Sequence, residues 1–450
     1  MASTISGSQA SASASEAQTP EQKRQVKRVL LSSYLGSAVE FYDFLVYGTA
    51  ASLVFGQLFF SNMTPLVGTI MSFGTLAVGY VARPLGGAIF GHFGDRLGRK
   101  KMLVLTMILM GVASTCIGLL PTQASIGMAA PLLLVTLRLI QGLAVGGEWG
   151  GATLMALEHS NSKKRGFSVG IVNAGGPTGA VLAAAIMGIF SLLPEDQFLA
   201  WGWRIPFLIS VLLVAIALWI RLGVEESPVF QQAQEKAKLA ETKVKQRAPI
   251  VDIILHPKAV LLSMFAGVAP LAVQSLLSSF ALTFAVSGGT GRSTALFAMA
   301  AASVLNIFAV PLSGALSDRV GRRPVLLTGL VLTAALSLPV FNLIGSGQTA
   351  LVFLGYFIGY GVLVGMLLGT LGAFISEQFT TGSRYTGASL GYQLGSTLGA
   401  GFAPLVATTL LNQAGYHTAV PIAVFVATFS VISAIAVLLT RESSRRSLNA

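Results

Sequence analysis

The stretch "GHFGDRLGRKKM", residues 91–102, lies between two long apolar runs and combines three glycines and one aspartate with four lysines and arginines. A second stretch, "GALSDRVGRRPV" at residues 314–325, repeats this pattern 223 positions later. The matching positions are Gly91 with Gly314, Asp95 with Asp318, Arg96 with Arg319, Gly98 with Gly321, and Arg99 with Arg322. Because self-similarity at a fixed offset indicates internal duplication, the chain is predicted to consist of two similar halves.

The composition is that of a membrane protein. Of the 450 residues, 53% are hydrophobic and only 10% are charged, whereas soluble domains carry about 25% charged residues. A helix needs about 20 residues to cross the bilayer hydrocarbon. Twelve apolar runs qualify, which predicts an all-α integral membrane protein with 12 transmembrane helices in two pseudo-symmetric six-helix bundles. The expected spans are 29–60, 65–91, 102–120, 127–157, 166–193, 203–222, 258–287, 293–316, 325–344, 348–376, 384–412 and 417–440.

The net charge of +12 could indicate a nucleic-acid partner, but the positions of the basic residues exclude one. Lysine and arginine gather before the first span, after the even-numbered spans and after the last, whereas the opposite loops hold only Arg204 and Arg292 at their edges. Since basic loops stay on the cytoplasmic side, both termini are predicted to be cytoplasmic. We therefore expect a multi-pass protein of the cell inner membrane, with the lipid bilayer as its surroundings.

The domain organisation follows from the one long polar interruption. Residues 223–257 are expected to form a cytoplasmic linker between an N-terminal six-helix bundle, 29–222, and a C-terminal one, 258–440. Residues 1–28 read as a disordered cytoplasmic tail without a signal peptide, and residues 441–450 as a second tail. The single cysteine excludes an internal disulfide.

The duplicated stretches predict a cytoplasmic gate. Asp95 and Asp318 can cap the next helix or face an arginine, and the arginines can reach carboxylates at neighbouring helix ends. A second duplication, in which a glutamate precedes an arginine by seven positions, supplies such carboxylates. The expected gate comprises Asp95, Arg96, Arg99, Glu158, Arg165, Asp318, Arg319, Arg322, Glu377 and Arg384. The alternative is a topology signal, but basic loops require neither the aspartates nor the repeated spacing.

The chain resembles the major facilitator superfamily. The duplicated pattern between spans two and three, and between spans eight and nine, is that family's signature. The stretches "VEFYDFLVYG" (39–48), "RPLGGAIFGHFGDRLGRKK" (83–101), "RLIQGLAVGGEWGGA" (138–152) and "WGWRIPFL" (201–208) look like its metabolite:proton symporter family. That family includes transporters of shikimate, α-ketoglutarate, citrate and proline or betaine, and the first half is most similar to the shikimate branch. The resemblance implies proton-coupled transport by two halves that rock against each other.

Five ionisable residues fall inside the expected spans: Glu40, Asp43, Arg83, Arg138 and Glu148. Each costs about 2.5–3.5 kcal/mol at the bilayer centre, so such groups usually serve function and face a cavity or one another. Asp43 and Arg138 lie near the middle of their spans and are expected partners. Proton-coupled sugar porters of the superfamily resemble this arrangement, which implies that Asp43 carries the proton, Arg138 switches it and Glu40 assists. A static buried ion pair is the alternative.

Substrate contacts are expected from both halves. The candidates are Arg83, Arg138, Glu148, Tyr47, Trp149, Gln274, Tyr392 and Gln393, with Asn306, Tyr356, Tyr360, Phe280 and Phe284 as further polar or aromatic residues of the second half. Lone amides and tyrosines in a bundle also serve as interhelical hydrogen-bonders. An arginine suits a carboxylate because its planar fork donates two parallel hydrogen bonds.

The function expected from these residues is symport of protons with a small carboxylate-bearing metabolite such as a shikimate-like acid, by a monomer. No nucleotide-binding loop, nucleophile motif or metal-ligand spacing is present, so neither an enzyme nor a cofactor or metal site is expected, and the proton is the coupling ion. Three alternatives stay open: import of betaine or proline, export by proton antiport, and a receptor that binds without transporting.

Overall fold

The computed structural model describes residues 20–97, 99–146, 153, 157, 164–222, 257–379, 384–414 and 418–444. Within these ranges the side chains of residues 20–30, 91–101, 103, 220–222 and 385 are not described. Glu148, Trp149 and Glu158 therefore lie outside the described residues, as do the linker 223–256 and both distal tails. Of Asp95, Arg96 and Arg99, only the helical backbone is described.

The described chain is helical throughout its length. Its helices are α1 (Pro20–Leu53), α2 (Phe55–Phe59), α3 (Pro65–Leu97), α4 (Arg99–Leu119), α5 (Gln123–Ile126), α6 (Ala129–Gly146), α8 (Arg165–Asn173), α9 (Gly175–Phe190), α10 (Glu195–Gln197), α11 (Arg204–Leu222), α14 (Lys258–Ser275), α15 (Ala281–Ser287), α16 (Arg292–Val320), α17 (Arg322–Ile344), α18 (Thr349–Tyr356), α19 (Gly365–Ser376), α20 (Arg384–Ser396), α21 (Ala403–Gln413) and α22 (Val420–Leu439). Four π-helical turns join consecutive helices: η1 (Phe198–Gly202), η2 (Leu276–Phe280), η3 (Phe357–Val364) and η4 (Thr397–Gly401).

Ten helices or helix pairs of the described chain are long and apolar enough to cross a membrane, from Pro65–Phe90 to Val420–Leu439. Each coincides with an expected span. The two other expected spans, 29–60 and 102–120, fall on α1 and α4. The first of them ends earlier than expected, because the helix breaks at Val54 before the short α2. The all-helical fold is therefore as predicted, and the count of twelve crossings stays a prediction.

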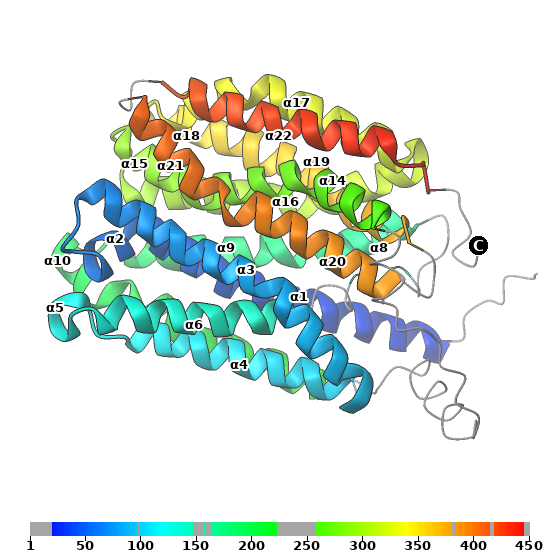
Figure 1. The fold of residues 1–450 in the computed structure, drawn as a ribbon, viewed down its shortest axis with the longest axis horizontal. Coiled ribbons are helices and arrows are strands. Elements are labelled where there is room, and N and C mark those ends of the chain that lie inside the picture. Colours follow the sequence, from blue (N-terminus) through cyan, green and yellow to red (C-terminus); the bar gives the residue numbers. More distant parts are fainter. Residues whose placement is uncertain are drawn as a thin grey trace, which may run out of the picture.

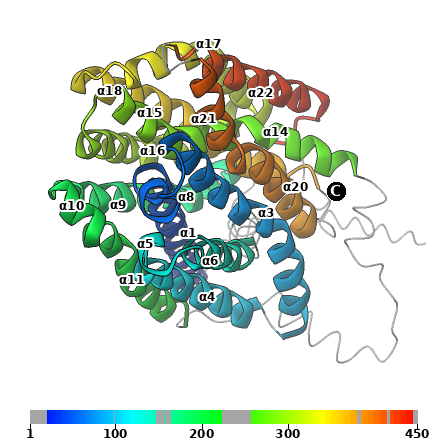
Figure 2. The ribbon, with the colours of Figure 1, turned by 60° about the vertical axis from the view of Figure 1, so that its left-hand side comes forward.

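The long helices lie side by side along the longest axis of the molecule (Figure 1). We call one end of this bundle the basic end, because Lys164, Arg319, Arg323 and Arg441 lie there; α1 begins and α22 ends at this end (Figure 1). The short helices α2, α5 and α10 mark the opposite end. In Figure 2 the helices of residues 20–222 gather on one side and those of residues 258–444 on the other.

Close backbone packing of α3 against α6 brings two arginines together. A Cβ atom on Gly142 would lie 2.1 Å from the carbonyl oxygen of Gly79, and one on Gly146 would lie 1.9 Å from that of Arg83. Only glycine permits this approach, as is usual where membrane helices meet through small residues. Arg83 on α3 and Arg138 on α6 consequently face the same interior region.

The "WGWRIPFL" stretch packs helices together at the end of the bundle opposite the basic end. The Trp203 ring is fully buried among Phe55, Phe59 and Phe207, at centroid distances of 5.9–6.0 Å. Arg204 donates through Nη1 to the carbonyl oxygens of Gly118 (2.9 Å) and Leu120 (2.6 Å). These carbonyls end α4 without an intrahelical partner, so the arginine caps that helix.

Candidate functional site

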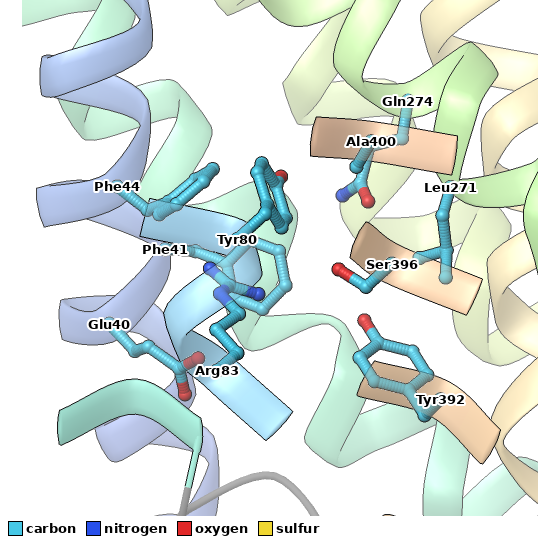
Figure 3. Close-up of a pocket in the computed structure, with 10 residues that line it drawn as sticks. All are labelled: Glu40, Phe41, Phe44, Tyr80, Arg83, Leu271, Gln274, Tyr392, Ser396 and Ala400. Carbon is cyan, nitrogen blue, oxygen red and sulfur yellow. The ribbon is translucent and has the colours of Figure 1, made fainter. Parts of the chain in front are cut away.

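A cavity lies between helices of the two sides of the molecule. Its lining residues come from α1, α3, α14, α20 and η4: Glu40, Phe41, Phe44, Tyr80, Arg83, Leu271, Gln274, Tyr392, Ser396 and Ala400. Figure 3 shows the first five facing the others across the open space. One side thus brings a cation, a carboxylate and aromatic rings, and the other brings hydroxyls, an amide and apolar groups.

Arg83 is the cation of this cavity and is 7% exposed. Its guanidinium carbon lies 4.4 Å from the ring centroid of Phe44 and 4.4 Å from that of Tyr80. The aromatic faces stabilise its charge in place of water. Its Nε has no hydrogen-bond partner among the described residues. An anionic ligand group in the cavity would satisfy that donor.

A second cavity lies among helices of residues 20–146. It is lined by Glu40, Asp43, Phe44, Arg83, Met110, Arg138, Gln141, Gly142 and Val145. Glu40, Phe44 and Arg83 also line the first cavity, so the two spaces adjoin.

Asp43 is 2% exposed and accepts hydrogen bonds from three side chains. Ser210 on α11 donates through Oγ at 2.7 Å, Gln141 on α6 donates through Nε2 at 3.1 Å, and Ser114 on α4 donates through Oγ. These donors replace the hydration of a buried carboxylate. Asp43 is therefore surrounded by neutral hydrogen-bond donors and does not pair directly with a cation.

Arg138 does not form the direct ion pair with Asp43 that the sequence suggests. Its Nη1 donates to Oε1 of Gln141 at 3.1 Å, and the same amide donates to Asp43, so Gln141 bridges the two charges. The Arg138 guanidinium carbon lies 4.2 Å from the Phe44 ring centroid and 4.0 Å from that of Tyr47. Its Nε and Nη2 have no hydrogen-bond partner among the described residues. Asp43 and Arg138 are separated because serine hydroxyls donate to the carboxylate and aromatic rings pack against the guanidinium.

The other candidate substrate contacts divide into two groups. Gln274 and Tyr392 line the first cavity as expected. Tyr47 instead donates to Oγ1 of Thr75 at 2.6 Å, and Gln393 donates to the carbonyl oxygen of Gly146 at 3.4 Å. Asn306 likewise donates to the carbonyl oxygen of Tyr360 at 2.8 Å. Tyr47, Gln393 and Asn306 thus act as hydrogen-bonders between helices.

Several lining residues were missed by sequence reasoning: Phe41, Phe44, Tyr80, Gln141 and Ser396. Two carried a usable signal, because Tyr80 precedes Arg83 by three positions and Gln141 follows Arg138 by three. On a helix this spacing places side chains on one face.

At the basic end, Arg322 forms the centre of the expected gate in the second half. It is fully buried and pairs with Asp318 (Nη1 to Oδ1, 2.8 Å) and with Glu377 (Nη2 to Oε1, 3.1 Å). Asp318 also accepts hydrogen bonds from the backbone amides of Gly166 (2.8 Å) and Phe167 (2.9 Å). It caps α8, from the other side of the molecule, rather than the next helix. This contact joins α16 to α8 at the basic end.

The segment after α22 is attached to the same cluster. Glu442 accepts hydrogen bonds from the backbone amides of Arg322 (3.0 Å) and Arg323 (2.9 Å), which caps the first turn of α17. Ser443 Oγ donates to Oε2 of Glu377 at 2.8 Å. Burial alone would raise the pKa of the Glu442 carboxyl, but the backbone amides of Arg323 and Arg322 outweigh it and lower the pKa below its ordinary value.

The remaining gate candidates differ in their surroundings. Arg165 and Arg384 are buried, and Arg384 donates through Nε to the carbonyl oxygen of Phe379 at 3.2 Å. Arg319 is exposed and lies outside the cluster. Among the described residues, no group of three or more side chains of the metal-ligating types comes together.

The family model of the Major Facilitator Superfamily matches residues 34–379 and, a second time, residues 262–450. The chain belongs to the major facilitator superfamily. It is accordingly a multi-pass inner-membrane transporter and not an enzyme.

Curated relatives agree along nearly the full length of the chain. The shikimate transporter of Escherichia coli is 38% identical over 426 residues, which cover 94% of this chain and 96% of the relative. The inner membrane metabolite transport protein YhjE of Escherichia coli is 38% identical, with 94% and 95% covered. The proline/betaine transporter of Salmonella typhimurium is 32% identical, with 94% and 85% covered.

Among solved structures, a D-xylose–proton symporter matches with a TM-score of 0.70, covering 93% of this chain and 99% of that one. The xylose transporter XylE from Escherichia coli, in a partially occluded inward-open conformation, matches with a TM-score of 0.71 over 94% and 100%. The identities are 17% and 16%, so these matches establish the shared fold.

Proposed function

We propose that this transporter imports a small monocarboxylate, of the shikimate-like hydroxylated type, together with protons. It works by alternating access as a monomer with twelve spans in bundles 29–222 and 258–440 and with both termini in the cytoplasm. The observation that carries the proposal is Arg83, a buried cation with an unpartnered Nε beside the central cavity.

The lining of the cavity supports a hydroxylated acid. Arg83 binds the carboxylate, since its planar fork matches two oxygens. Gln274, Tyr392 and Ser396 lie across the cavity and supply hydroxyls and an amide for ring hydroxyl groups. The described lining of the second half holds no charge, which suits a neutral polar ring better than a second carboxylate.

Asp43 is the proposed proton carrier, with Arg138 as its switch and Glu40 at the junction of the two cavities. Protonation removes the charge that Ser114, Ser210 and Gln141 now stabilise. The protonated carboxyl donates as well as accepts, so the hydrogen bonds that run through Gln141 to Arg138 rearrange. This is how the proton state of Asp43 reaches the neighbouring cavity.

The cluster of Asp318, Arg322 and Glu377 is proposed as the cytoplasmic gate. Its contact with α8 holds the basic end shut and must break when the site opens to the cytoplasm. The matching first-half residues, from Asp95 to Arg165, are proposed to act in the same way.

Import of a betaine is the second candidate, because Glu40 and the rings of Phe44 and Tyr80 line the same cavity. A quaternary ammonium would bind to such rings and to a carboxylate. Arg83 opposes it by occupying both ring faces with a guanidinium.

Isothermal titration of purified protein with shikimate and with glycine betaine distinguishes the two. We expect wild type to bind shikimate, and Arg83→Lys to bind it at least about tenfold more weakly because an ammonium cannot donate the paired hydrogen bonds. Arg204→Lys, distant from the cavity, is the matched control. Binding of betaine without binding of shikimate by wild type would overturn the proposal.

A further inference from the structure

The ring of Phe44 lies where the two cavities meet. Phe44 comes from α1, directly after Asp43 in the chain, and it lines both the cavity of Arg83 and the cavity of Asp43 and Arg138. Arg83 lines both cavities, Arg138 lines only the second, and Phe44 contacts both arginines.

The aromatic rings and the guanidiniums form a continuous series of contacts. Arg138 lies 4.0 Å from the Tyr47 centroid and 4.2 Å from that of Phe44. Arg83 lies 4.4 Å from the Phe44 centroid and 4.4 Å from that of Tyr80. Phe44 and Tyr80 are themselves in edge-to-face contact at 4.7 Å. Two like charges are thus held against one shared ring.

This geometry gives the shared ring two effects. It fixes the position of both guanidiniums through its π face. It also replaces water between the cavities with an apolar group, and charges interact more strongly through such a medium than through water. An anion that neutralises Arg83 therefore changes the electrostatic potential at the charges around Asp43.

We propose that Phe44 is the positioning residue that couples substrate binding to protonation. With the ring in place, a carboxylate at Arg83 and a proton at Asp43 favour each other, since the proton offsets the negative charge that the carboxylate adds. This inference rests on the proposed function, whose substrate and proton sites it joins. By linkage, each ligand raises the affinity for the other by the same factor, about 5–150-fold in typical cases.

The charged and titratable groups that face this cluster come from four helices. They are Glu40, Asp43 and Tyr47 on α1, Tyr80 and Arg83 on α3, Arg138 on α6, and Tyr392 on α20. The variants used in the test leave all of them unchanged.

The test measures shikimate affinity at pH 5.5 and pH 8.0 and protons taken up per shikimate in proteoliposomes, with counterflow as the readout of exchange. Phe44→Leu and Phe44→Met remove the ring, and Phe44→Tyr keeps it. Phe429→Leu is the matched control, because Phe429 packs against Phe425 within α22 and lines neither cavity. Melting temperature and monodispersity establish which variants are folded.

We expect wild type, Phe44→Tyr and Phe429→Leu to bind shikimate at least about fivefold more tightly at the lower pH. The folded aliphatic variants at position 44 should retain counterflow, with that ratio reduced to about one and fewer protons per shikimate. Wild-type stoichiometry in them would overturn the inference, and so would loss of coupling in Phe44→Tyr. Wild-type protein without proton-linked shikimate uptake would overturn the proposed function itself.

Discussion

Replacing Gly314 with alanine should force open the closed basic end. Gly314 is the first glycine of the second duplicated stretch and faces Gly166 at the start of α8. A Cβ atom on Gly314 would lie 2.3 Å from the carbonyl oxygen of Gly166 and 3.2 Å from that of Gly369. The first of these contacts is about 1 Å too short, and both partners are backbone atoms that cannot rotate away.

The expected magnitude follows from overpacking costs of about 1–3 kcal/mol. The strain exists only while α16 and α8 are in contact, so it destabilises the closed state and leaves the open state unaffected. Because 1.4 kcal/mol corresponds to a factor of ten, the ratio of open to closed molecules should rise about 5–150-fold.

The assay is cysteine labelling from the cytoplasmic side of inside-out vesicles. Cys116→Ser removes the native thiol, and Asn173→Cys places a reporter in a cavity that Phe41, Gly372 and Tyr392 also line. The labelling rate should rise in Gly314→Ala by the factor above. Gly74→Ala is the control, since its Cβ would have its nearest neighbour at 3.9 Å. Equal rates in the two folded variants would refute the reasoning.

Three further perturbations test the gate and the proton site. Glu377→Gln leaves Arg322 buried with one carboxylate fewer, which should cost about 3–5 kcal/mol in the closed state and increase labelling of the same reporter; an unchanged rate would assign the pair to topology alone. Glu442 has a lowered pKa, so its contribution to stability is complete above about pH 4.3 and is lost as the pH falls through its folded pKa. The melting temperatures of wild type and Glu442→Gln should therefore differ at pH 7 and approach each other as the pH falls below the folded pKa of Glu442, and a constant difference down to acidic pH would contradict this. Gln141→Leu removes the bridge between Asp43 and Arg138 and should impair pH-driven uptake more than counterflow; equal losses in the two assays would indicate a packing defect.

The charged residues of the site were predictable because placing a charge inside the membrane costs free energy. Asp43, Arg83 and Arg138 stand out in apolar runs, and a charge in the membrane requires a partner or a cavity. The phenylalanines around them, Phe41 and Phe44, were not predictable, since a phenylalanine in an apolar span usually packs in the core or faces lipid. Phe44 acquires its significance only from the two guanidiniums that the fold brings to it.

Contacts between distant segments were also beyond sequence reasoning. The duplicated pattern predicted that Asp318 would cap the next helix or face an arginine; it pairs with Arg322, but the helix that it caps is not the next one. The capped helix is α8, more than 150 positions earlier in the chain, and nothing in a local pattern specifies that partner. The bridge through Gln141 was missed for a similar reason, because the depth of two charges along their helices leaves their lateral separation undetermined.

Proton coupling through Asp43 is the central claim, and transport by Asp43→Asn in proteoliposomes tests it most directly. Asparagine keeps the size of the side chain and one acceptor oxygen, replaces the other oxygen with an NH2 donor, and removes the titratable group. We expect Asp43→Asn to retain shikimate counterflow and to lose accumulation driven by an imposed pH gradient. Accumulation by Asp43→Asn at the wild-type level, with the same number of protons per shikimate, would contradict the account.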